Sequence, residues 1–121
     1  MTSPSTDRRY GLLGDRAIKA PVATVATSNI TLSGEQTING VSVLAVNAAS
    51  VPDRVLCTAQ TDATENGVWN VATGAWSRSF DADGNTELAQ GTMFVVQRGT
   101  YEGAVYRIST ADPITIGTTS I

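Results

Sequence analysis

The chain has 121 residues and a formal net charge of -3, with one Cys and no His. That length accommodates one domain. Only 16% of the residues are charged, whereas an average globular chain carries roughly 25%. The acidic balance argues against a nucleic-acid partner, because such partners require many cations to neutralise phosphates. The lack of His excludes histidine-based catalytic triads and Cys/His zinc sites.

The N-terminal residues differ in charge from the rest of the chain. Residues 1–20 hold four cations and two acids, a net charge of +2, whereas residues 21–121 hold four Arg and nine acids, a net charge of -5. We therefore predict a basic and apolar arm over residues 1–20 and a β domain over residues 21–121. Tyr and Arg are enriched at interface hot spots, and exposed apolar clusters usually contact a partner. The predicted contact residues of the arm are Arg8, Arg9, Tyr10, Leu12, Leu13 and Arg16.

No segment has the length of apolar sequence that a secretory signal or a membrane helix requires. We therefore expect no membrane partner, and a chain that stays in the cytoplasm or leaves it inside an assembly.

Alternating and β-branched residues predict ten short strands in the β domain. Asn39-Gly40 between apolar residues is the strongest hairpin signal. Short connections between short strands favour antiparallel pairing. The predicted fold is all-β, a small antiparallel β-sandwich or partly closed barrel, and its predicted core contains Val55, Val68, Val71, Trp76, Phe94, Val95 and Tyr106. The predicted strands are 22–26, 30–32, 36–38, 41–44, 54–58, 68–71, 75–79, 92–97, 104–109 and 114–116.

The aromatic residues allow two interpretations. If Gly74 is a hairpin tip, Trp69 and Trp76 lie on adjacent strands and stack, as cross-strand aromatic pairs do. We interpret both as core residues. The alternative is a carbohydrate-binding module that stacks sugars on aromatic rings; its candidate residues are Trp69, Trp76, Tyr101 and Tyr106.

Catalytic and metal chemistry have little support in the sequence. The acidic segment 81–87 has its Gly and Glu at the wrong positions for a calcium loop, so we interpret it as a solvated turn. Cys57 lies in an apolar run and is predicted to be a buried thiol. Seven carboxylates lie at predicted turns, which needs no catalytic explanation. We expect no enzyme activity, no cofactor and no metal site.

Five segments of the chain carry a resemblance to a known family, namely residues 17–22, 26–41, 53–56, 60–69 and 74–78. Together they resemble the N-terminal virion-anchoring domain of tailed-bacteriophage tail fibre and tailspike proteins. The resemblance implies a structural virion protein of the viral tail, usually a homotrimer, that attaches the fibre or spike to an adaptor, nozzle or baseplate protein after assembly in the host cytoplasm. It carries no catalytic motif to this segment.

Two features depart from that family. Residues 44–52 are longer than the tight turn expected there, and we interpret them as a loop specific to a partner. Such proteins also normally continue beyond the position of Ile121 into a shaft or β-helix. The alternatives that stay open are a fragment of a longer fibre, a stand-alone adaptor, a head-decoration protein or the carbohydrate-binding module.

Overall fold

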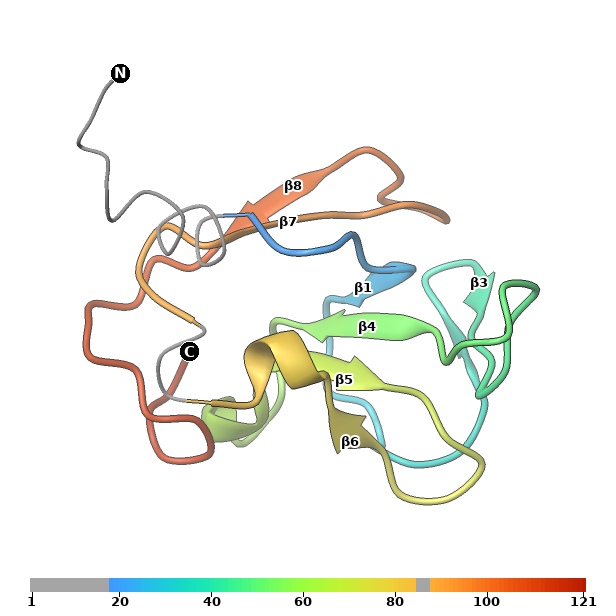
Figure 1. Ribbon diagram of the computed structural model, residues 1–121, viewed down its shortest axis with the longest axis horizontal. Coiled ribbons are helices and arrows are strands. Elements are labelled where there is room, and N and C mark those ends of the chain that lie inside the picture. The colour runs from blue at the N-terminus through green and yellow to red at the C-terminus, as the bar shows by residue number, and fades with distance from the viewer. Residues whose placement is uncertain (1–17, 85–87) are drawn as a thin grey trace.

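The computed structural model describes residues 18–84 and 88–121, and these form a small all-β domain (Figure 1). The all-β prediction is confirmed, and the sheets remain open rather than closing into a barrel. The main sheet has four strands in the order β1-β4-β5-β6, namely β1 (Thr24–Ala26), β4 (Arg54–Cys57), β5 (Gly67–Asn70) and β6 (Ser77–Arg78). Two further strand pairs are β2 (Thr37–Ile38) with β3 (Val41–Ser42), and β7 (Met93–Val95) with β8 (Val105–Arg107). Two 3-10 turns complete the elements, η1 (Ala63–Glu65) and η2 (Phe80–Ala82).

One strand pair departs from the predicted antiparallel pattern. β1 and β4 run parallel, with Thr24 beside Val55 and Ala26 beside Cys57. Parallel strands require a long crossover between them, and residues 27–53, which include the β2–β3 hairpin, provide it. The antiparallel prediction rested on the short connections between strands and is wrong for this pair, because the partner of β1 is β4 and not the next strand along the chain.

The segment before β1 joins the main sheet to the β7–β8 pair. Ile18 bridges Met93 and Val22 bridges Val96, both in parallel. Between the two bridges the segment before β1 therefore advances four residues while the facing strand advances three. Such a mismatch is a β-bulge, and it contains Pro21, which suits a bulge because it has no N–H to donate. The paired structure therefore begins no later than residue 18, before the predicted domain start at residue 21.

The main sheet is buried on both faces. Because side chains alternate along a strand, Leu56 and Val68 face one side, whereas Val55 faces the other. The first core cluster lies between the main sheet and the β7–β8 pair and contains Val22, Val25, Leu56, Val68, Ala82, Leu88, Phe94, Val96, Ile108 and Ile114. The second lies against the β2–β3 hairpin and contains Ala26, Ile38, Val41, Val43, Val55, Cys57, Val71 and Trp76.

Most of the predicted core is confirmed. Five of the seven residues are buried, namely Val55, Val68, Val71, Trp76 and Phe94. Tyr106 is half-buried and packs against the first cluster. Val95 was predicted wrongly, since it is 37% exposed. On β7 the alternation directs Phe94 into the core and Val95 outward, and nothing in the described residues covers that outer side.

The predicted hairpin turn is confirmed, but two of the predicted strands are not. Asn39 and Gly40 have φ angles of 47° and 85°, as the predicted two-residue hairpin requires. The Asn39 side chain also donates a 2.7 Å hydrogen bond to the Val25 carbonyl, which ties the hairpin to β1. Residues 30–32 and 114–116, however, form no strand. Ile114 instead packs into the first core cluster from an irregular segment.

Candidate docking surface

The outer side of the β7–β8 pair is an exposed apolar surface. Val95 lies opposite Val105, and Met93 lies opposite Arg107. Ile18 is bridged to Met93 from the other side of β7. The exposed fractions are 62% for Ile18, 59% for Val105 and 37% for Val95. We call these five residues the ribbon face. Contiguous apolar exposure of this kind is typical of protein interaction sites.

The free edge of β8 adjoins the ribbon face. Within the described residues β8 pairs only with β7. Ala104 and Ile108 direct their backbone groups toward β7, because the Ala104 carbonyl accepts from Val96 N at 2.9 Å and Ile108 N donates to the Thr92 carbonyl at 2.8 Å. Alternation along the strand then turns the backbone groups of Val105 and Arg107 toward solvent. An exposed edge of this kind can pair with another chain.

The predicted contact residues of the arm all lie outside the described residues. They are Arg8, Arg9, Tyr10, Leu12, Leu13 and Arg16. The structure does describe the junction where residue 18 begins, and Figure 1 shows it alongside β7. There Lys19 N donates a 3.0 Å hydrogen bond to the Met93 carbonyl. The chain that precedes residue 18 therefore joins the domain next to the ribbon face.

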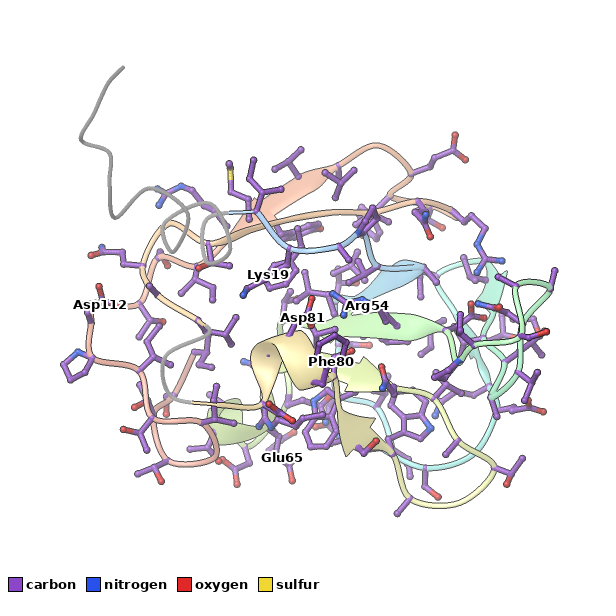
Figure 2. The ribbon with its side chains drawn as sticks, viewed as in Figure 1. Lys19, Arg54, Glu65, Phe80, Asp81 and Asp112 are labelled. Carbon is purple, nitrogen blue, oxygen red and sulfur yellow. The ribbon has the colours of Figure 1, made fainter. Side chains whose placement is uncertain are left out.

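A charged cluster fixes this junction to the main sheet. Arg54 Nη2 donates to the Ala20 carbonyl at 2.9 Å, while its Nη1 donates to Asp81 Oδ1 at 2.7 Å and to Ser79 Oγ at 2.9 Å. Figure 2 shows Lys19 on the same side of the sheet as Arg54 and Asp81. The cluster is therefore a structural clamp between residues 18–20 and η2.

The structure uses the acidic segment differently from a metal loop. Asp81 is ion-paired to Arg54, and residues 85–87 lie outside the described residues. Among residues 18–84 and 88–121, no three His, Cys, Asp or Glu side chains gather as metal ligands would. Cys57 is buried as predicted, with 1% exposed, and burial raises the pKa of its thiol to about 12.

The four aromatic residues do not form one sugar-binding platform. Trp76 is 6% exposed, and its indole N–H donates to the Gly34 carbonyl at 2.9 Å. The cross-strand partner of Trp69 is Arg78 rather than Trp76, and the Arg78 guanidinium lies 4.5 Å from the centre of the Trp69 ring. The predicted tryptophan stack is therefore wrong. Both Trp residues pack on the second core cluster, whereas Tyr101 and Tyr106 pack on the first, across the sheet.

A pocket lies at the end of the molecule where β4 ends and β5 begins. Its volume is about 210 Å³. Its lining includes Arg107, the last residue of β8, and Ser109, which follows that strand. The apolar residues that line it are Leu56, Leu88, Phe94, Ile108 and Ile121.

Sequence reasoning missed the ribbon face because it counted Val95 as core and did not single out Met93 or Val105. The available signal was the alternation itself. Since Phe94 and Val96 are apolar and Met93 and Val95 are apolar too, both faces of β7 are hydrophobic, and an antiparallel pair commonly packs only one face on the core and leaves the other in water.

Comparison with known proteins returns no match: no family model fits the chain, and neither the curated proteins nor the solved structures contain a similar one. A search of residues 18–84 and 88–121 found no helix with the length and apolar character needed to cross a membrane.

Proposed function

We propose that the chain is a non-enzymatic structural virion protein, an anchoring domain that attaches a tail fibre or tailspike to the tail of a bacteriophage. The observation that carries the proposal is the ribbon face, an apolar surface beside the junction of residues 1–17 with the domain. The resemblance to phage anchoring segments supports the same role from the sequence.

The physical argument concerns the cost of exposing apolar side chains. Ile18 and Val105 are each more than half exposed, so burying them against a partner removes apolar surface from water at roughly 25 cal/mol per Å². Residues 18–20 adjoin that surface, and the sequence that precedes them contains Arg and Tyr, residue types that dominate interface energetics. One continuous docking surface on another tail protein, such as an adaptor, nozzle or baseplate component, accounts for both features.

The attachment of residues 18–20 to the main sheet suits an anchor. The Arg54 clamp holds the junction to the main sheet through hydrogen bonds to Asp81, Ser79 and the Ala20 carbonyl. The junction at residues 18–20 is therefore already fixed to the four-stranded sheet before a partner binds, and such preorganisation lowers the entropic cost of binding.

Incorporation into particles tests the proposal. We expect the double variant Val95→Asp/Val105→Asp to remain folded, because both side chains are already exposed, and to be lost from purified virions. Deletion of residues 1–16 is expected to have the same effect on incorporation, with the thermal melt confirming that the domain still folds.

The matched control is Phe80→Asp, since Phe80 is 80% exposed but lies on η2, outside the ribbon face. Its incorporation is expected to equal that of the unaltered protein. Normal incorporation of the Val95/Val105 variant would overturn the ribbon face as the docking surface.

A further inference from the structure

The outer edge of β8 presents a regular set of backbone hydrogen-bonding groups. Tyr106 lies opposite Phe94 of β7, and alternation along the strand turns the N–H and carbonyl groups of Val105 and Arg107 to the other edge. Within the described residues no strand pairs with that edge, and Figure 1 shows β8 at the margin of the molecule with β7 on its inner side. Two N–H donors and two carbonyl acceptors, at alternate residues of one strand, match the backbone of an extended peptide.

This edge is held in its extended shape before any partner binds. The residues that flank β8 are tied to β7 by backbone hydrogen bonds, from Val96 N to the Ala104 carbonyl at 2.9 Å and from Ile108 N to the Thr92 carbonyl at 2.8 Å. Ile108 is also buried in the first core cluster. Because the edge is preorganised, it loses little entropy when another strand is added to it.

The side chains of the ribbon face have a cationic character. The face contains four apolar residues, one arginine and no carboxylate. Neither of the ion pairs seen in the described residues, which contain Arg54 and Arg98, includes Arg107. Arg107 is exposed on the same face as Val105, two residues away on the strand. A partner strand at this edge therefore meets one apolar and one cationic position.

The charge of the neighbouring sequence favours an acidic partner. Residues 1–20 have a net charge of +2, whereas residues 21–121 have a net charge of -5, so the ribbon face adjoins the cationic part of an acidic chain. Opposite charges across an interface attract each other, and like charges disfavour the wrong partner. Residues 1–17 hold three Arg and two Asp, so they do not themselves supply an excess of carboxylates to this face.

We propose that the partner bound at the ribbon face is an extended acidic segment, which adds to β8 as an antiparallel strand with a carboxylate beside Arg107 and an apolar side chain beside Val105. The inference rests on the proposed docking role and specifies the partner of that surface. In antiparallel pairing a residue can exchange both hydrogen bonds with the residue opposite it. Two residues of the partner therefore satisfy the free backbone groups of Val105 and Arg107, while the alternate side chains provide specificity.

A peptide titration followed by NMR on the full chain tests the pairing. The probe is the peptide Thr-Thr-Glu-Thr-Val-Thr-Thr, blocked at both ends, whose Glu and Val face Arg107 and Val105 in the proposed register. At millimolar peptide the amides of Val105 and Arg107 are expected to shift and to exchange more slowly with solvent. Methylation of the Glu and Val backbone nitrogens is expected to abolish binding, whereas methylation of the Thr between them is expected to preserve it. Any other pattern would overturn the proposed pairing.

A charge exchange tests the acidic preference. The matched peptide with Lys in place of Glu is expected to bind about fivefold more weakly, because like charges directly opposite each other are destabilising. Arg107→Glu, at an exposed position, is expected to reverse the preference of the protein for the two peptides, and a thermal melt establishes that this variant folds. Equal binding of both peptides to the unaltered protein would show that the partner segment need not be acidic, contrary to the proposal.

Particle incorporation separates this inference from the proposed function. If the peptide with Glu does not bind while the Val95→Asp/Val105→Asp chain is still lost from virions, the strand addition is wrong and the anchoring role is retained. If that peptide binds in the proposed register while the double variant is incorporated normally, the edge site is retained and the anchoring role of the ribbon face is wrong.

Discussion

The main sheet and the β7–β8 pair are built from similar residues but end up in different environments. The last three residues of β4 are all buried, whereas β7 buries Phe94 and exposes Val95, and Val105 of β8 is 59% exposed. The difference lies in what covers the second side. The β2–β3 hairpin packs on one face of the main sheet and the β7–β8 pair on the other, but within the described residues nothing packs on the outer side of β7 and β8.

The arginines of the main sheet and of the β7–β8 pair also lie in different environments. Arg78 of β6 donates to the Asn66 and Thr64 carbonyls, each at 2.8 Å, and burial lowers the pKa of its guanidinium. A Cβ at Gly67 would lie 2.6 Å from Arg78 Nη1, and Gly67 has a φ of 132°, a conformation that residues with a side chain rarely adopt, so glycine is favoured there. Arg107 of β8, by contrast, is exposed on the ribbon face. In the main sheet arginines hold the fold together, and on the β7–β8 pair the arginine is available to a partner.

The largest expected effect comes from two adjacent residues of β7. Phe94→Ala removes a side chain that is 2% exposed in the first core cluster, and such truncations cost about 3–5 kcal/mol of unfolding free energy. Val95→Ala, on the exposed side, is expected to change it by less than about 0.5 kcal/mol. Urea denaturation of both variants measures the difference. Equal losses would show that the outer side of β7 is buried after all.

The next effect concerns the loop that connects β3 to β4. Asp53 is buried, and its carboxylate accepts hydrogen bonds from Leu44 N and from the Asn47 side chain, both at 2.9 Å. Asp53→Ala leaves both donors without their acceptor, and an unsatisfied buried group costs about 1–3 kcal/mol. We expect a loss of about 2–3 kcal/mol in urea denaturation. Hydrogen exchange of residues 44–52 is expected to increase more than exchange of β5. Glu102→Ala, at an exposed turn, is the control and is expected to leave both measurements unchanged.

The smallest effect concerns the alkaline stability of the main sheet. Burial raises the pKa of the Cys57 thiol from 9.0 to about 12, so between these values the unfolded chain releases a proton that the folded protein keeps. The stabilisation is complete below pH 9 and is lost as the pH rises toward 12. At pH 10 the expected loss is about 1 kcal/mol.

Comparison with Cys57→Ala isolates that contribution, because every other group that titrates in this range is the same in both proteins. The variant is expected to lose less stability between pH 8 and pH 10 than the unaltered chain. Parallel pH profiles would mean that the thiol ionises equally in the folded and unfolded states.

Local sequence signals predicted all eight strands of the described residues and one turn, together with two strands that do not form. Asn39-Gly40 forms the expected hairpin because both positions accept a positive φ, and Val68 and Trp69 face opposite sides because side chains alternate on a strand. The partners of these strands were harder to predict. Trp69 lies opposite Arg78 because Asn70 pairs with Ser77, which leaves Trp76 in the connection before β6, and no local signal determines this register.

The candidate docking surface was predicted only at its border. Residues 1–20 were expected to contact a partner, but the ribbon face was not predicted. Val95 lies in an apolar run, as the buried valines do, and was therefore counted as a core residue. The 44–52 loop was recognised as unusual from its length alone, and the part played by Asp53 became apparent only when Leu44, Asn47 and Arg98 converged on it.

The sequence by itself determined that this chain forms short strands, buries its thiol and makes a glycine hairpin, because those outcomes depend on backbone preference and on hydrophobic alternation over a few residues. The tertiary structure decided which strands pair, that β1 runs parallel to β4, and that one apolar side of the β7–β8 pair stays in water. These outcomes depend on contacts between residues far apart in the chain, and alternation is the same for a strand whether or not another layer covers it.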